Sequence, residues 1–422
     1  MAIRWLAFST VWVLCGCGVP STFEQVRAAT GGARQGTHAA LVLDGDEQPL
    51  VAYLDEASGG AHALRFTRHD ASRNAWTAPV TVADGLGEVD LLTGRNLVSL
   101  ARDASTGRLG VAFMKNEQFC DGANKEDTVH VSFSTDQGAT WSVPERVSEA
   151  RYLDTVEVCN TTMPRIAMHG GKVHVAWAAA AGELESPTNF FHGYHHAVSS
   201  GSGWTVSLLP RVGATGAKGA DVLDLAVDAS GSAAVAYVMQ DTANGNTRYV
   251  GFFRPGGAAV KVTDTGNTQN DNPRLSLAFD GNKPRVATQL VRPAKPDFMT
   301  YELFESDDGA AFTGRALPTD GQDSGNAYLD LVYAGGRGLL VHDYGSSGAT
   351  APGASGGPKL LRGQGGSWTI AGADTLNRQF LGEFAAAALT ADGKALVAFF
   401  TDVADSAPAA RFGPGLVLYR ER

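Results

Sequence analysis

Four side chains that could do chemistry lie within five consecutive residues: His192, Tyr194, His195 and His196. Imidazoles ligate metal ions and abstract protons, so the cluster is a candidate for either role. The segment has the pattern of a β-strand, in which successive side chains point to opposite faces. His192 and Tyr194 then share one face and His195 takes the other, which favours aromatic packing over a joint site. The sequence has no phosphate-binding Gly-rich loop, nucleophile elbow or paired metal-ligand motif, so we expect no metal and no cofactor.

The N-terminus has the pattern of an export signal. Arg4 is followed by an apolar stretch from Trp5 to Leu14 that is too short to span a bilayer. It ends in Leu14-Cys15-Gly16-Cys17, which resembles the lipobox of bacterial lipoproteins and implies a lipid-bearing Cys17 at the mature N-terminus. We expect residues 1–17 to be the signal and the protein to be anchored in the bacterial outer membrane or at the cell surface. Ordinary secretion is the alternative, because Cys15 is unusual at its position.

Two further cysteines, Cys120 and Cys159, follow the signal. An exported chain meets an oxidising compartment, where two thiols tend to pair. We therefore predict one disulfide between them, which would stabilise the fold by roughly 4 kcal/mol through loop closure if it is unstrained. Two cysteines alone make a poor metal site.

The scaffold that positions these side chains is defined by a repeat. A hairpin pattern recurs, with an apolar run, a turn of Gly, Asp, Asn or Ser, and a second run rich in Val, Ala and aromatic residues. Third and fourth extended stretches follow most copies, so four strands recur about every 50 to 60 residues, as in a β-propeller. The seven copies begin at His38, Leu97, Pro164, Leu223, Pro273, Ala327 and Phe384.

The ends of the chain predict how the ring closes. The seventh copy stops after its third strand, residues 415–422, and residues 23–28 resemble the fourth strands of other copies. The N-terminal strand can therefore pair with the last copy and cover its exposed edge. We predict an all-β fold with one domain over residues 18–422, a propeller of seven four-stranded blades, with six blades as the alternative.

One turn matches a named motif. Residues 134–141, Ser-Thr-Asp-Gln-Gly-Ala-Thr-Trp, match the Asp-box of sialidase-like propellers, also called the bacterial neuraminidase repeat. Residues 305–312 keep an Asp, a Gly and an aromatic residue at the same spacing. The resemblance implies a structural turn on the face opposite the active site. The residues assigned to this role are Ser134, Asp136, Gly138, Trp141, Asp307, Gly309 and Phe312.

The predicted register also indicates where a site would lie. Connections into the first strand of each blade share a face with those between the second and third strands. Resemblance to sialidases implies that three arginines hold a substrate carboxylate, with Tyr as nucleophile, Glu as its activator and Asp as acid/base. The Arg-Ile-Pro motif of sialidases is missing, so surface ion pairs remain an alternative for the arginines. The candidate binding or catalytic residues are Arg95, Arg165, Arg274, Glu117, Asp224, Tyr328, Asp343, Tyr344 and Glu383.

The amino-acid composition limits the classes of partner that the protein could bind. The net charge is -10 and no run of Lys or Arg occurs, which argues against nucleic-acid binding. We predict a non-catalytic cell-surface lipoprotein whose propeller face binds a glycan or an envelope protein. The alternative is a glycan-active enzyme, a sialidase-like exo-glycosidase or a polysaccharide lyase. Convergence of acid, base and carboxylate-binding groups over the central channel would favour the enzyme.

Overall fold

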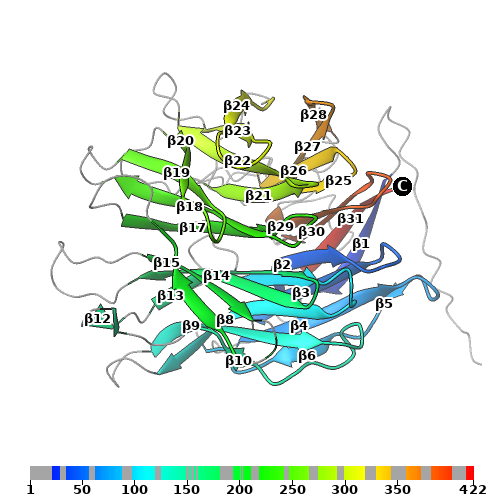
Figure 1. Cartoon of the computed structure of the whole chain (residues 1–422). Helices are drawn as coiled ribbons and strands as arrows, with labels where there is room; N and C mark the ends of the chain where they lie inside the picture. The colour runs from blue at the N-terminus through cyan, green and yellow to red at the C-terminus, as the bar shows by residue number, and fades with distance from the viewer. Residues whose placement is uncertain are drawn as a thin grey trace, which may run out of the picture.

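The computed structural model is an all-β propeller of seven antiparallel blades (Figure 1). No helix occurs among the residues it describes, and hence none there is long and apolar enough to cross a membrane. These residues are 21–28, 35–56, 62–87, 97–118, 125–148, 152–153, 156–157, 160–180, 193–199, 201, 203–210, 218–241, 247–265, 274–291, 299–318, 329–343, 358–371, 382–401 and 415–422.

Blades 1 to 4 follow one another along the chain, each running from its innermost to its outermost strand. Blade 1 contains β2 (Gln35–Leu43), β3 (Pro49–Glu56), β4 (His62–Asp70), β5 (Ala75–Trp76) and β6 (Val80–Ala83). Blade 2 contains β7 (Val98–Arg102), β8 (Leu109–Gln118), β9 (Lys125–Ser134) and β10 (Glu145–Arg146). Blade 3 contains β13 (Asn160–His169), β14 (Lys172–Ala180), β15 (Gly193–Ser199) and β16 (Thr205–Leu208). Blade 4 contains β17 (Lys218–Val227), β18 (Ala233–Asp241), β19 (Thr247–Phe253) and β20 (Val260–Asp264).

Blades 5 to 7 complete the ring. Blade 5 contains β21 (Leu275–Asp280), β22 (Lys283–Val291), β23 (Met299–Glu305) and β24 (Thr313–Ala316). Blade 6 contains β25 (Leu329–Ala334), β26 (Arg337–Asp343), β27 (Pro358–Gln364) and β28 (Ser367–Ala371). Blade 7 contains β29 (Gly382–Leu389), β30 (Ala395–Thr401), β31 (Gly415–Glu421) and β1 (Ser21–Ala28). A separate two-stranded sheet joins β11 (Tyr152–Leu153) and β12 (Val156–Glu157).

The N-terminal strand closes the ring, as the sequence predicts. β1 pairs antiparallel with β31, from Ser21 opposite Glu421 to Ala28 opposite Gly415. Phe23 packs on Tyr419 with ring centroids 5.4 Å apart. Pairing of the two chain ends leaves β31 with a partner on both sides, which removes an edge that could otherwise recruit another chain.

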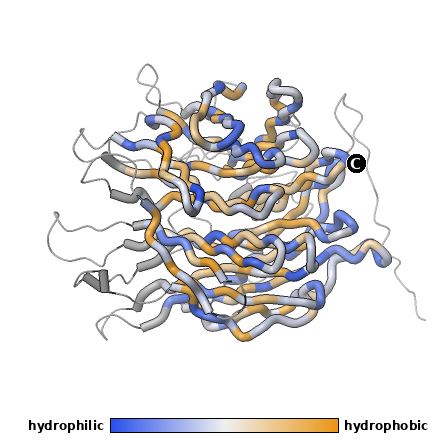
Figure 2. Tube along the Cα trace, in the orientation of Figure 1, coloured by the Kyte–Doolittle hydropathy of each residue, from blue (hydrophilic) through white to orange (hydrophobic). Residues whose placement is uncertain are grey.

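The core lies between the blades. Among the described residues, seven buried apolar clusters occur, and each joins two neighbouring blades. Alternation along each strand sends one set of side chains to the preceding blade and the other set to the following blade. Figure 2 shows hydrophobic residues along the strands and hydrophilic residues at many of the turns. Both faces of each blade are therefore buried, and for this reason the sequences of the strands are long apolar runs.

The turns between first and second strands lie on one side of the ring, which we call the turn face. Neighbouring turns are hydrogen-bonded to one another there. Asp103 accepts from the backbone N–H groups of Gly170 and Gly171, and Glu47 accepts from that of Ala391. These bonds join blade 2 to blade 3 and blade 7 to blade 1, so the ring is fastened on this face. First strands begin at the opposite face.

Candidate functional site

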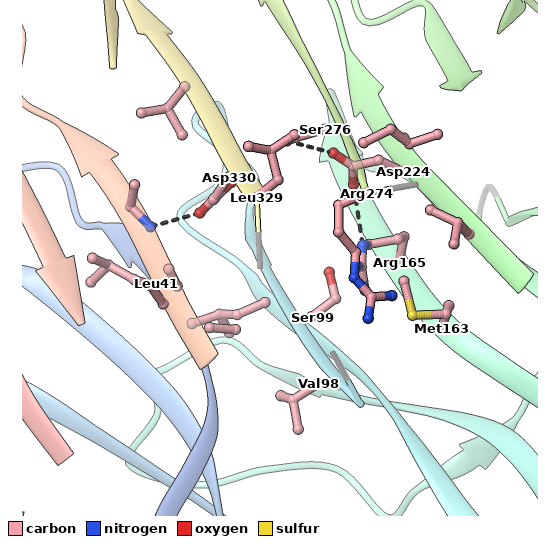
Figure 3. Close-up of a pocket in the computed structure, with 18 residues that line it drawn as sticks. Leu41, Val98, Ser99, Met163, Arg165, Asp224, Arg274, Ser276, Leu329 and Asp330 are labelled. Atoms are coloured by element: carbon pink, nitrogen blue, oxygen red, sulfur yellow. Dashed lines mark hydrogen bonds and ion pairs between the residues drawn. The ribbon is translucent and has the colours of Figure 1, made fainter. Parts of the chain in front are cut away.

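The innermost strands enclose a cavity of about 180 Å³ on the axis of the propeller (Figure 3). All seven blades contribute to its wall, because the first strand of every blade runs along the axis. The wall is apolar on the side of blades 7 and 1 and polar on the side of blades 3 to 6. Its lining residues are Ala40, Leu41, Val98, Ser99, Leu100, Met163, Arg165, Val222, Asp224, Arg274, Leu275, Ser276, Leu329, Asp330, Val332, Ala385, Ala386 and Ala387.

One register position recurs around this cavity, and we call it the ring position. A first strand is the inner edge of its blade, so half of its N–H groups point away from the second strand. At four junctions the ring-position side chain accepts a hydrogen bond from such an N–H of the next blade. The bonds are Ile166 N to Ser99 Oγ (3.1 Å), Leu277 N to Asp224 Oδ2 (2.7 Å), Leu331 N to Ser276 Oγ (3.0 Å) and Ala387 N to Asp330 Oδ2 (2.6 Å). The seven ring-position residues are Ala40, Ser99, Arg165, Asp224, Ser276, Asp330 and Ala386.

Asp224 connects three blades. Its Oδ1 pairs with Arg165 Nε of blade 3 at 3.2 Å, and its Oδ2 accepts from Ser276 Oγ of blade 5 at 3.0 Å. The guanidinium of Arg165 also donates from Nη1 to the carbonyl of Pro164. Both charged side chains are largely buried, with 15% and 16% of their surface exposed. Ionic contacts at this depth are screened less by solvent than surface pairs.

Asp330 is the second carboxyl group of the cavity. Burial raises its pKa to about 7, and the nearby carboxylate of Asp224 adds to the rise. The Ala387 N–H and the charge of Arg165 oppose the rise without cancelling it. A carboxyl group that titrates near neutral pH can donate or accept a proton under physiological conditions.

Arg274 lies immediately before β21 and lines the same cavity. Its backbone is held by neighbouring β22, because its carbonyl accepts from Gln289 N at 3.0 Å and from Thr288 Oγ1 at 2.9 Å. The cavity therefore carries two guanidinium groups, those of Arg165 and Arg274, and two carboxyl groups, those of Asp224 and Asp330. Guanidinium groups recognise carboxylates, sulfates and phosphates through paired hydrogen bonds.

The structure brings three of the nine candidate residues together, namely Arg165, Asp224 and Arg274. The backbones of Glu117, Asp343 and Glu383 lie in β8, β26 and β29, and their side chains are outside the described part of the chain. Arg95, Tyr328 and Tyr344, the expected lipid site Cys17, and the expected disulfide partners Cys120 and Cys159 lie outside the described residues.

Sequence reasoning missed Ser99, Ser276 and Asp330. A signal for them was present, because each sits between two apolar residues of a first strand, as Asp224 does: Val-Ser-Leu, Leu-Ser-Leu and Leu-Asp-Leu. A polar residue at one fixed position of an otherwise apolar repeat indicates a shared environment. That environment is the axis of the ring.

The turn after β9 has the internal bonds that its sequence predicts. Asp136 accepts from the hydroxyl of Thr140 at 2.5 Å, from Thr140 N at 2.9 Å and from Ser134 Oγ at 2.8 Å, and these contacts lower its pKa to about 2. Trp141 packs edge-on against Phe66 of blade 1, with ring centroids 5.2 Å apart. Gly138 has a φ of 84° beside the same Phe66 ring. The turn thus fastens blade 2 to blade 1.

The related turn in blade 5 differs in one respect. Gly309 N donates to Ser306 Oγ at 2.8 Å, and Phe312 packs on Phe252 of blade 4 at 5.1 Å. Asp308, rather than the expected Asp307, accepts a backbone bond inside the turn, from Ala310 N. The Asp307 side chain is 84% exposed and pairs with Lys283. The reason is spacing: serine and glycine are one residue closer here than in the turn of blade 2.

His174, His195 and His196 of blade 3 are packing residues, whereas His192 lies outside the described residues. His195 stacks on Trp177, whereas His196 stacks on His174 with Nδ1 of His174 3.1 Å from Nε2 of His196. Burial lowers the pKa of all three imidazoles to about 4. The expected alternation holds, since Tyr194 packs on Tyr237 of blade 4, away from His195. Among the described residues no group of three or more His, Cys, Asp or Glu side chains could hold a metal ion.

Comparisons with known proteins give the fold. No protein-family model matches the chain, and neither does any curated protein. An ulvan lyase of polysaccharide lyase family PL25 is 12% identical with a TM-score of 0.56, covering 93% of this chain and 94% of the lyase. A structure of the same lyase family bound to a GlcA(1-4)Rha3S saccharide is 12% identical with a TM-score of 0.54, covering 93% of this chain and 95% of the lyase. The NanB sialidase of Streptococcus pneumoniae is 10% identical with a TM-score of 0.46, covering 94% of this chain and 70% of the sialidase. The chain is similar to the ulvan lyase in architecture.

Proposed function

We propose that the protein binds an acidic glycan, with the negatively charged group of the sugar held at Arg165 and Arg274 in the axial cavity. The observation that carries the proposal is that Arg165 and Arg274 line one cavity on the axis of the propeller. An anion there would accept charge-assisted hydrogen bonds, which are stronger than neutral ones.

The charged groups of the cavity wall are compatible with an anionic ligand. Arg165 shares its charge with Asp224 at 3.2 Å, and Asp330 is neutral below about pH 7. Both arginines line the cavity, so an anionic group there would lie near positive charge, which a cationic ligand would meet unfavourably.

A glycan-active enzyme is the second candidate function, and Asp330 is the observation that favours it. A carboxyl group with a pKa of about 7, in a cavity that two arginines also line, has the properties of a general acid in glycan cleavage. The ulvan lyase shares the fold and is a polysaccharide lyase by name. That likeness supports the candidate only by analogy of fold.

The test is a binding and turnover assay on the propeller domain, residues 18–422. Glycans ending in sialic acid, glucuronic acid or neutral sugars are incubated with the protein, and retained ligands and products are read by mass spectrometry. The expected result is retention of acidic glycans only, weakened by about tenfold or more in Arg274→Gln. Arg73→Gln serves as the control, because Arg73 lies in a turn of blade 1 with 81% of its side chain exposed.

The outcomes separate the candidates. Retention without products supports a binding protein, and release of a sugar or an unsaturated uronide supports the enzyme. Retention of neutral glycans, or equal loss in both variants, contradicts the role of the cavity. No retention at all would redirect the search to an envelope protein as the partner.

We also propose that Cys17 anchors the protein to a bacterial membrane after export. The support is the lipobox-like run that ends at Cys17. Ser21 follows four residues later and begins β1 opposite Glu421, at the turn face. An anchor at Cys17 would hold this face toward the membrane and leave the first-strand entrances facing away. Mass spectrometry of the membrane-extracted N-terminus tests this, with an unmodified N-terminus as the contradicting result.

A further inference from the structure

Among the described residues, two of the seven equivalent backbone N–H groups at the axis lack a side-chain acceptor. At four junctions a serine or aspartate of one blade accepts from the first strand of the next. At the junction of blades 3 and 4, Leu225 N donates to Asp224 Oδ1 at 3.0 Å. The equivalent donors in blades 1 and 2 are Leu41 and Leu100. The residues before them around the ring are Ala386 and Ala40, and alanine has no side-chain oxygen.

The direction of the Leu41 N–H group follows from the pairing of β2 with β3. Asp44 N donates to the carbonyl of Gln48 at 2.9 Å, across the hairpin toward β3. Successive N–H groups of a strand point to opposite edges. Leu41 lies three residues before Asp44, with unbroken register between them, so its N–H group points to the inner edge.

The same holds for Leu100 in blade 2. Asp103 N donates to the carbonyl of Arg108 at 2.9 Å, toward β8. Three residues earlier, the Leu100 N–H group therefore points to the inner edge of β7. Both leucines line the axial cavity, and so do Ala40 and Ala386.

The side chains agree with this placement. Ala386 packs in one buried cluster with Leu41, and Ala40 packs in another with Leu100. The side of the cavity formed by blades 7, 1 and 2 therefore combines two backbone donors with alanine methyl groups. A buried backbone N–H group is almost always hydrogen-bonded in native proteins, so solvent or a ligand in the cavity must supply the acceptor for these two donors.

We propose that the N–H groups of Leu41 and Leu100 form a second subsite of the axial cavity, which binds an uncharged oxygen of the acidic glycan. This inference rests on the proposed function, because it assigns the other end of the same ligand. The ligand is an acidic sugar whose charged group meets Arg165 and Arg274. A hydroxyl or carbonyl oxygen of the sugar accepts from the two N–H groups, and its C–H groups meet the alanine methyls.

The test installs the missing acceptors. Ala386→Ser and Ala40→Ser place a hydroxyl at the ring position, where Ser99 and Ser276 already accept such bonds. The expected result is a Tm that rises by a few degrees without ligand, because each new hydroxyl satisfies a buried donor. The affinity for free glucuronate, measured by calorimetry on residues 18–422, should fall by about fivefold because the hydroxyls occupy the subsite.

Ala39→Ser is the matched control. Ala39 is one residue away from Ala40, is fully buried and packs toward blade 7, where it lies in one cluster with Ala398. The same added hydroxyl there should lower the Tm and leave glucuronate affinity unchanged.

The outcomes distinguish the inference from the proposed function. Failure of the wild-type chain to bind glucuronate or any other acidic sugar contradicts the proposed function and removes the ligand from both proposals. Wild-type binding with unchanged affinity in Ala386→Ser and Ala40→Ser overturns the subsite alone. A Tm that falls in these variants as in Ala39→Ser also overturns it, since the donors would already be satisfied.

Discussion

Asp330 is a residue whose pKa the fold raises into the physiological range. Its pKa is about 7 in the folded chain, against 3.8 for an ordinary aspartate. Between these two pH values the folded chain holds a proton that the unfolded chain has lost. The contribution of Asp330 to folding stability therefore falls as pH rises from about 4 to 7. The positive charge of Arg165 lessens this loss of stability, and the negative charge of Asp224 increases it.

Asp330→Asn should remove that pH dependence. Asparagine can still accept the hydrogen bond from Ala387 N through its amide oxygen, but it cannot ionise. We expect the variant to be more stable than the wild type at pH 8, by on the order of 1 to 4 kcal/mol, with little difference at pH 4. Urea unfolding at several pH values measures the difference, and parallel curves for the two proteins would contradict it.

The sequence could place some of these residues but not their contacts. Arg165, Asp224 and Arg274 follow from the predicted register, because each lies at or near the start of one of the apolar repeat copies that begin at Pro164, Leu223 and Pro273. The pairing of Asp224 with Arg165 and Ser276 could not be predicted, since it depends on the stagger between neighbouring blades. Asp330 was missed for the same reason: within its strand it reads as one polar residue in a core segment.

At the scale of single elements, the turn after β9 shows how a short motif fastens two blades. Gly138 has a positive φ, and a Cβ atom there would collide with the ring of Phe66 in β4. The same Phe66 ring packs against Trp141. The absence of a side chain at Gly138 is therefore a packing requirement as well as a backbone requirement.

Gly138→Ala should be far more destabilising than Gly107→Ala. Gly107, in the turn between β7 and β8, also has a positive φ (73°), but a Cβ atom there meets nothing within 4 Å. Gly107→Ala should cost about 1 kcal/mol from the backbone alone. Gly138→Ala should cost roughly 3 kcal/mol or more, because Phe66 must also move. Thermal or urea unfolding compares them, and equal losses would sink the packing explanation.

Blade 3 should make the protein sensitive to acid. The buried imidazoles of His174 and His196 have pKa values of about 4, whereas histidine in the unfolded chain titrates near 6.5. As pH falls from 6.5 to 4, the unfolded chain binds protons that the folded chain does not bind, so the free energy of unfolding decreases. His196→Leu should reduce this loss by on the order of 1 to 3 kcal/mol. An unchanged slope of unfolding free energy against pH would contradict the burial argument.

At the scale of the whole molecule, closure by β1 holds the two ends of the chain together. Glu24 of β1 pairs with Arg420 at 3.4 Å, in addition to the contact of Phe23 with Tyr419. Every blade rests on two neighbours, so opening one junction exposes two apolar faces. The ring is for this reason expected to unfold as one unit.

Removing residues 18–28 should expose β31 as an unpaired edge. We expect a Tm lower by several degrees and the appearance of dimers or aggregates, because an open edge pairs with other chains. Removing only residues 18–20 leaves β1 intact and is the control. Gel filtration and thermal unfolding compare the two truncations, and a monomer with unchanged Tm in the longer truncation would refute the closing role of β1.

The propeller architecture could be predicted from the sequence because the repeated hairpin pattern specifies it. Seven hairpin patterns, an incomplete last copy and a matching N-terminal segment suffice for seven blades and for the closing strand β1. The alanine-rich run at residues 385–388 is a strand, as its hairpin context indicates. The axial cavity was beyond sequence reasoning, because it depends on how seven first strands converge and which side chains fill the space between them.

The most direct test of the central claim is a crystal structure of residues 18–422 soaked with glucuronate. The account predicts a carboxylate beside Arg165 and Arg274 in the axial cavity, with a sugar oxygen at the Leu41 and Leu100 N–H groups. Glucuronate bound at another surface, with the cavity holding only solvent, would contradict it.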